Sequence, residues 1–151
     1  MNMKRIIYLF IAAVSMMSLF ACQKEGERVM EELVGEWHYS GTSQGVDEDV
    51  WIAFSANGEF EMYQKIGTGA HWHTVGTYSY DKEDNILSGV YSDKYPWKYD
   101  YSVNVTESSM VLKAVQLDNY SVTYKRESIP AEVRQKALEL TKAGEGFVPF
   151  L

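Results

Sequence analysis

Apolar and polar residues alternate along most of this 151-residue chain, and glycine, asparagine and serine interrupt the alternation at short intervals. Phe60 and Met62, for example, alternate with Glu59 and Glu61. A period of two is typical of strands that bury one face, whereas an amphipathic helix repeats every 3.6 residues. The dipeptide Asn57–Gly58 just before this segment is a strong signal for a hairpin turn. The pattern therefore predicts a chain that folds mainly as antiparallel strands.

Eight such segments follow one another between turn signals, at residues 35–42, 49–55, 59–66, 71–80, 86–91, 98–106, 110–115 and 119–126. Sequential hairpins form a meander, and closure into a barrel leaves none of its strands with an open edge. We therefore predict an all-β fold, an eight-stranded antiparallel up-and-down barrel over residues 35–127. A β-sandwich built from the same strands is the alternative.

The segment after the last strand is expected to form a helix over residues 129–143 that packs on the outside of the barrel. Pro130 suits a first helical turn because its missing N–H has no partner there, and Gly144 is a typical stop signal. One apolar stripe at helical spacing contains Ile129, Val133, Ala137 and Leu140. The apolar tail that follows, 147–151, is expected either to cover an opening of the barrel or to dock on its outside.

The first 21 residues have the layout of a signal peptide. Lys4 and Arg5 precede an apolar run from Ile6 to Ala21, which is shorter than the roughly 20 residues that span a bilayer as a helix. The run ends in Leu19-Phe20-Ala21-Cys22, which resembles the lipobox of bacterial lipoproteins. The resemblance implies cleavage before Cys22 and attachment of fatty acyl chains, such as palmitate, to it. Two or three such chains hold a protein on a membrane.

The composition of the mature chain limits its partners. Cys22 is the only cysteine, and its position favours modification over a disulfide. Residues 22–151 contain 12 Lys and Arg against 21 Asp and Glu, a formal charge of −9. Such an acidic domain argues against nucleic acid as a partner. No Asp follows Cys22 directly, so by resemblance to other lipoproteins the outer membrane is the expected address, with the domain facing the periplasm or the cell surface. Residues 22–34 then form a tether and a short helix.

Two motifs at the ends of the β region resemble those of lipocalins. Gly35-Glu36-Trp37 opens the first strand like the lipocalin Gly-x-Trp signature, and Arg126 closes the last strand like the lipocalin arginine. The resemblance implies that Arg126 stacks on Trp37 near a closed end of the barrel, with residues 29–33 plugging that end as a short helix. The whole β region is also similar to the lipocalin-like lipoproteins of Gram-negative bacteria.

Catalysis is not expected, and neither is a cofactor. The chain has no Gly-x-Ser-x-Gly motif, no phosphate-binding glycine loop and no dinucleotide fingerprint. His71 and His73 lie two residues apart on one face of a strand, a spacing that can chelate a metal. The same alternation that places Trp72 inside the barrel places both histidines outside, so we expect an ordinary outward-facing pair and no metal.

Aromatic residues are abundant, with 18 in residues 22–151, and they suggest a ligand site. Rings with a few polar tips suit a small hydrophobic or amphipathic ligand inside a barrel. The residues expected to face inward and line that site are Tyr39, Met62, Gln64, Trp72, Tyr78, Tyr99, Tyr101 and Tyr124.

An interaction or inhibitor module that binds a protein or a glycan is the competing hypothesis. It predicts a packed barrel and an exposed aromatic patch at loop ends. The residues expected in such a patch are Trp51, Tyr91, Tyr95 and Trp97.

Overall fold

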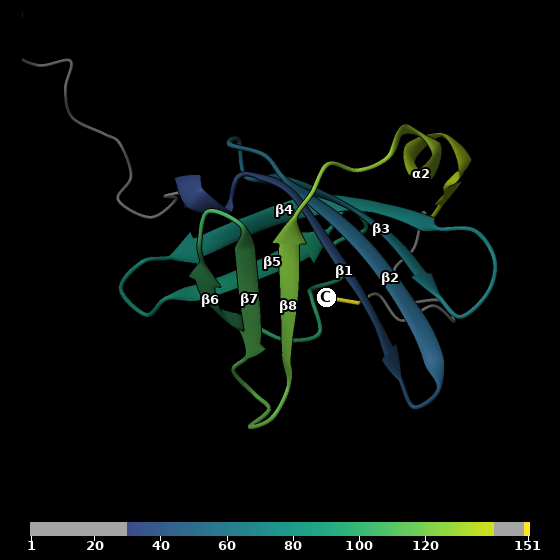
Figure 1. Ribbon diagram of the computed structural model, residues 1–151. Helices are drawn as coiled ribbons and strands as arrows, with labels where there is room; N and C mark the ends of the chain where they lie inside the picture. The colour runs from purple at the N-terminus through teal and green to yellow at the C-terminus, as the bar shows by residue number, and fades with distance from the viewer. Residues whose placement is uncertain (1–29, 141–149) are drawn as a thin grey trace, which may run out of the picture.

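Eight antiparallel strands follow one another along the chain and close into a barrel, as Figure 1 shows. The computed structural model describes residues 30–140 and 150–151. Closure is complete because β1 pairs with β8 and β3 pairs with β4. The elements are η1 (Glu31–Leu33), β1 (Gly35–Ser43), β2 (Val46–Phe54), β3 (Glu59–Ile66), β4 (Trp72–Asp81), β5 (Ile86–Tyr91), β6 (Tyr101–Val105), β7 (Ser109–Ala114), β8 (Ser121–Arg126), α2 (Ala131–Lys136) and β9 (Leu138–Glu139).

The predicted barrel is confirmed, and the sandwich alternative is wrong because one sheet contains every strand. The first hairpin is longer than expected. Gln44 and Gly45 have φ angles of 51° and 80°, which form a two-residue turn and allow pairing to continue to Ser43 and Val46. The hairpin expected at Asn57–Gly58 also forms, with φ of 83° at the glycine.

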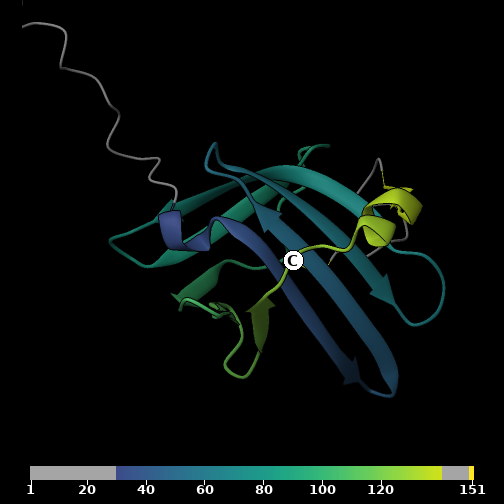
Figure 2. The same cartoon turned by 45° about the horizontal axis from the view of Figure 1, so that its top comes forward.

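The interior holds one large apolar cluster, and a second small cluster lies on the outer wall. The interior includes Trp37, Met62 and Tyr124, all 0% exposed. On the outside, Trp51 of β2 and Tyr63 of β3 are buried by the segment that carries α2. The helix therefore packs against the outer face of the barrel as predicted, and Figure 2 shows it outside the strands.

The helix is much shorter than predicted. It ends at Lys136, and Ala137 already has extended backbone angles. The N–H groups of Leu138 and Leu140 donate to the carbonyl oxygens of His71 and His73, so that β9 lies parallel to the start of β4. This edge is open because β5 pairs with β4 only from Gly76 onward. Pairing of exposed backbone groups thus replaces the helical turns that the sequence pattern favoured.

Strand β6 also begins later than predicted, at Tyr101 instead of residue 98. The preceding loop folds inward and inserts Trp97 into the interior, where its ring is 6% exposed and lies 5.1 Å from the Phe60 ring. The N–H of Trp97 donates to the carbonyl of Gly89. Residues 98–100 lead the chain from Trp97 back to the barrel wall, where β6 begins.

One end of the barrel is closed by the contact that the lipocalin-like motifs predicted. The Arg126 guanidinium lies 4.1 Å from the centre of a Trp37 ring. Arg126 donates to the carbonyl oxygens of Glu32 and Val34, and the Trp37 indole N–H donates to the carbonyl of Leu33. Leu33 itself is fully buried, so η1 plugs this end. Within the described part of the chain, no helix has the length and apolar character needed to cross a membrane.

Candidate functional site

A row of polar and aromatic side chains crosses the inner wall of the barrel. Strand register places Tyr39, Gln64 and Trp72 on one row through β1, β2, β3 and β4. Tyr124 of β8 continues it, with its ring 5.9 Å from that of Tyr39. Four of the eight residues predicted to line the lumen therefore lie together, because each stands at the inward phase of its strand.

The exposure of these side chains decreases from the rim to the interior. Trp72 begins β4 at the rim and is 36% exposed, whereas Gln64 and Tyr124 are at most 1% exposed. Tyr39 is half-buried, and its hydroxyl donates to Glu48. A buried amide and a buried phenol in an otherwise apolar interior need hydrogen-bond partners. This part of the lumen therefore has the composition of a small amphipathic site.

The other four predicted residues are spread more widely. Tyr101 is buried beside the row, and Met62 lies deeper in the apolar core. Tyr78 lies toward the closed end, where its hydroxyl donates to the carbonyl of Ser55. Tyr99 is half-buried on the loop side of Tyr101. The structure thus brings Tyr39, Gln64, Trp72, Tyr101 and Tyr124 together and leaves Met62, Tyr78 and Tyr99 at the margins.

The last two residues of the sequence occupy this part of the lumen. Leu151 is 2% exposed and belongs to the interior cluster, and Phe150 packs against it. The Phe150 ring lies 5.4 Å from the Tyr39 ring, and its N–H donates to Gln64 Oε1 at 2.7 Å. The Tyr91 hydroxyl donates to the backbone oxygen of Leu151 at 2.8 Å. Of the two expected positions for the apolar tail, inside or outside, Phe150 and Leu151 adopt the inside one; 147–149 lie outside the described residues.

Sequence reasoning missed Tyr91 as a lumen residue, having placed it in an exposed patch. The hydroxyl of Tyr91 is directed inward because Leu87, Gly89 and Tyr91 share one phase of β5, and Leu87 is fully buried. Strand alternation alone would have found it. Thr74, which is 4% exposed on the same inward phase as Trp72, was missed in the same way.

The phenols of the lumen stay protonated at neutral pH. Burial raises the pKa of Tyr124 well above its usual range, and the nearby phenols of Tyr101 and Tyr91 add to the effect. Burial likewise raises the pKa of Tyr91 and of Tyr101, and it raises that of Tyr78 to about 12. Neutral phenols are hydrogen-bond donors, so the site offers donors without charge.

Two of these donors have no hydrogen-bond partner among the described residues. The hydroxyls of Tyr101 and Tyr124 are both fully buried and unpaired. A buried, unsatisfied hydroxyl costs about 1–3 kcal/mol, so native structures contain few of them. Both residues belong to the interior cluster that contains Leu151, so their hydroxyls are polar groups within the lumen.

A groove of about 650 Å³ lies beside the β4–β5 pair. Its walls include Asn57, Ser79, Ser88 and Trp97. Of the eight predicted lumen residues, only Tyr78 lines it, so the groove does not extend to the row that contains Gln64 and Tyr124.

His71 and His73 face outward, as predicted, and each of the three histidines lies within hydrogen-bond distance of at least one carboxylate. Asp49 lies between two imidazoles, with His38 Nε2 and His71 Nε2 each 2.7 Å from one of its oxygens. Burial disfavours ionisation of Asp49, but the hydrogen bonds from both histidines outweigh it and lower its pKa. Within residues 30–140 and 150–151, no group of three or more His, Cys, Asp or Glu side chains is placed to hold a metal.

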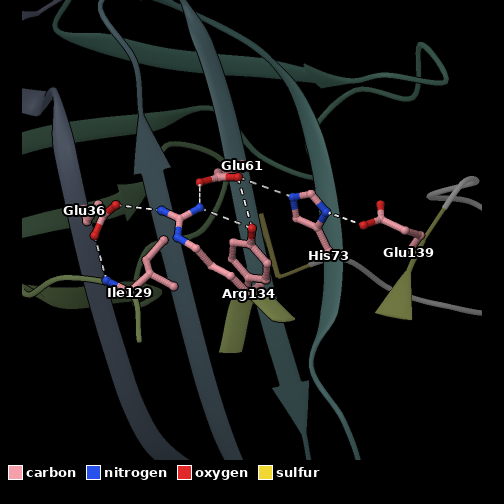
Figure 3. Close-up of polar contacts among 7 residues, drawn as sticks. Glu36, Glu61, His73, Ile129, Arg134 and Glu139 are labelled. Atoms are coloured by element: carbon pink, nitrogen blue, oxygen red, sulfur yellow. Dashed lines mark hydrogen bonds and ion pairs between the residues drawn. The ribbon is translucent and has the colours of Figure 1, made fainter. Parts of the chain in front are cut away.

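His73 belongs to a second network, which fastens α2 and β9 to the wall (Figure 3). Its imidazole lies 2.9 Å from Glu139 and 3.5 Å from Glu61, and it stacks on Tyr63 at 4.4 Å. Arg134 of α2 bonds Glu61 and Glu36, and Glu36 also accepts from the N–H of Ile129. The two outer networks therefore hold the fold together on the outer face of the barrel.

The aromatic patch expected for an interaction module is wrong. Trp51, Tyr91 and Trp97 are between 3% and 6% exposed, and only Tyr95 is on the surface, at 51%. Trp51 lies beneath the α2 segment and stacks on His38 at 3.6 Å, while Tyr91 and Trp97 face the interior. The prediction of an exposed patch is wrong because the α2 segment covers Trp51 and because Tyr91 and Trp97 pack into the interior.

Comparison with known proteins identifies a fold but no family. The chain matches no protein-family model, and no curated protein matches it. A protein from Bacteroides uniformis ATCC 8492, solved by NMR, has a similar structure, with a TM-score of 0.54 and 16% sequence identity. The similarity covers 72% of this chain and all of that one. At this identity the likeness is one of fold.

Proposed function

We propose that this protein is a lipid-anchored, lipocalin-like barrel that binds a small hydrophobic or amphipathic ligand in its lumen and does not catalyse a reaction. The observation that carries the proposal is the lining of the lumen around Leu151. Apolar rings surround it, Tyr91 and Gln64 hydrogen-bond to a bound segment, and the hydroxyls of Tyr101 and Tyr124 have no partner among the described residues. An amphipathic molecule can pack against the apolar rings and also hydrogen-bond to the hydroxyl groups.

The anchor half of the proposal depends on Cys22, which lies outside the described residues. The lipobox-like sequence before it and the absence of any other cysteine support acylation at this position. The structure is compatible with a tether, because η1 follows it directly and lies at the closed end of the barrel. We propose an outer-membrane address, with the opposite end of the barrel directed away from the attachment point.

Mass spectrometry of the full chain under native conditions tests the ligand. We expect a co-purifying small molecule that organic solvent releases. A fluorescent fatty-acid analogue provides the second measurement. Tyr124→Phe removes only the unpaired hydroxyl, and a change of up to about tenfold in the affinity of the analogue is expected if that hydroxyl contacts the ligand.

Tyr95→Phe is the matched control, because the Tyr95 side chain is exposed and is not part of the interior cluster. It should leave the affinity unchanged. If no small molecule co-purifies and the analogue does not bind to the full chain or to a chain without residues 150 and 151, the lumen has no carrier role.

A further inference from the structure

The contacts that hold Phe150 and Leu151 in the lumen are those of peptide recognition. Gln64 Oε1 accepts the N–H of Phe150, and the Tyr91 hydroxyl donates to the backbone oxygen of Leu151. Both bonds are to backbone atoms. Among the described residues, the Leu151 side chain is buried in the interior apolar cluster and the Phe150 ring packs on Tyr39. Backbone hydrogen bonds combined with apolar side-chain sites are a common way to bind peptides.

Gln64 makes the site selective for a molecule with an amide N–H. Its side chain is 1% exposed, and its Oε1 accepts the N–H of Phe150. A fatty acyl chain offers no donor at this point, so it lacks the hydrogen bond that the N–H of Phe150 makes to Gln64. Sites that lose a buried hydrogen bond discriminate strongly against the ligand that lacks the group.

Tyr91 is a neutral hydrogen-bond donor to Leu151, whereas Gln64 contacts Phe150. Burial raises its pKa, so the hydroxyl stays protonated and offers a hydrogen to a carbonyl oxygen. Gln64 on β3 and Tyr91 on β5 come from different strands, and β4 lies between them in the sheet. Their spacing across the barrel is therefore fixed by strand pairing, independently of the segment they bind.

We propose that the lumen is a binding site for an apolar peptide segment, that Phe150–Leu151 occupies it within the same chain, and that a segment of the same chemistry from another molecule can replace the pair. The proposal rests on the proposed function and names the ligand class. The bound pair acts as a competitor, so the affinity for an external peptide is reduced by the fraction of molecules in which the pair is in place.

Acetyl-Phe-Leu-amide is the probe, because it carries the N–H and the carbonyl that Gln64 and Tyr91 contact. Binding is measured by isothermal titration calorimetry to the full chain and to a variant that lacks residues 150 and 151, with circular dichroism as the test of folding. We expect the shortened variant to bind at least tenfold more tightly than the full chain. The same dipeptide with an N-methyl group on phenylalanine lacks the donor and should bind at least fivefold more weakly.

Tyr91→Phe in the shortened variant removes only the donor hydroxyl and should weaken dipeptide binding several-fold, whereas the control Tyr80→Phe should not. Tyr80 is matched because its hydroxyl donates to Asn85, near the β4–β5 turn. If the shortened variant does not fold, Leu151→Ala in the full chain provides the same test, since it weakens the occupant and should raise the affinity for added dipeptide several-fold.

The outcomes separate the two proposals. If a folded shortened variant binds a fluorescent fatty-acid analogue but not the dipeptide, or binds the N-methyl dipeptide equally well, peptide recognition is overturned and the carrier function stands. If it binds neither molecule, both are overturned. If it does not fold and Leu151→Ala binds the dipeptide no better than the full chain does, exchange of the pair is overturned.

Discussion

The indole of Trp97 lies directly against Gly89, in the space that a Cβ on this residue would fill. The contact allows the loop after β5 to fold into the barrel, where Trp97 meets Phe54, Phe60 and Tyr101. A strand glycine in contact with an aromatic ring thus determines the shape of the interior.

Gly89→Ala should therefore lower the free energy of unfolding by about 2 kcal/mol, because the added methyl group forces Trp97 out of its position. Chemical denaturation measures the loss, and the emission of Trp97 should shift to the red as the ring becomes exposed. Thr77→Ala, at an exposed position of β4 paired with Val90, is the control and should change stability by less than about 0.5 kcal/mol. Equal stability of the two variants would mean that Trp97 adapts without strain.

Arg126→Met should destabilise the closed end of the barrel. It removes the cation–π contact with Trp37, worth about 0.5–2 kcal/mol, and the bonds to the carbonyls of Glu32, Val34 and Glu107. We expect a loss of about 2 kcal/mol in urea denaturation and faster amide exchange in η1. Lys125→Met, one residue earlier and exposed, should have little effect; a similar loss there would indicate a general effect of removing charge.

Arg134→Met should loosen α2 and β9 while the barrel stays folded. The substitution keeps an apolar stem but removes the bonds to Glu36 and Glu61, and it leaves these two carboxylates without their cation. Hydrogen exchange over residues 131–139 should rise several-fold, with a stability loss of about 1–2 kcal/mol. Lys136→Met, exposed on the same helix, is the control. Unchanged exchange in the Arg134 variant would show that Ile129 and Val133 suffice to dock the helix.

Asp49 should make stability depend on pH in the acid range. Its pKa is lower in the folded state than in the unfolded chain, so its contribution is fully present above the ordinary value of about 3.9. The contribution is lost as the pH falls through the lowered pKa. Asp49→Asn should cost about 1–2 kcal/mol at pH 7, and the difference from the wild type should shrink toward zero below pH 3.

The exposed Asp47→Asn is the matched control for that pH series. Its difference from the wild type should stay small at every pH. If the free energies of unfolding of the wild type and Asp49→Asn differ as much at pH 2.5 as at pH 7, the charge of the Asp49 carboxylate does not contribute to stability.

Cys22→Ala should release the protein from the membrane. If the proposed acylation occurs, wild-type protein sediments with membranes and its N-terminal peptide carries the mass of fatty acyl chains, whereas the variant does neither. Ser15→Ala, inside the apolar run, is the control and should remain membrane-bound. A wild-type protein that begins at another residue, with an unmodified thiol at Cys22, would contradict the lipoprotein proposal.

The barrel could be predicted because each strand is indicated by the alternation of apolar and polar residues within its own segment. Phe60 and Met62 point inward simply by alternating with Glu59 and Glu61, and the Gly35–Trp37 and Arg126 motifs indicated where the barrel closes. The failures share a physical cause. Leu140 fits a helical stripe, yet the backbone N–H groups of Leu138 and Leu140 pair with the open edge of β4, and no local pattern reveals that edge.

The interior of the site was harder to predict for a similar reason. Trp97 stands in a segment rich in turn residues, and its burial depends on Gly89, eight positions earlier. Leu151 carries only an apolar side chain, and nothing beside it in the sequence indicates Tyr91 or Gln64 as partners. Contacts between distant residues therefore decide what the lumen holds, even where the wall itself follows from the sequence.

The short strand β9 has a consequence for solubility. Its two residues cover the part of β4 at Trp72 and His73 that β5 does not reach. Without them, the backbone donors and acceptors of that stretch would form a template on which another molecule can add a strand. Damage to the segment after β8, by proteolysis or by weakening its hold on the wall, should therefore first appear as self-association of an otherwise intact barrel.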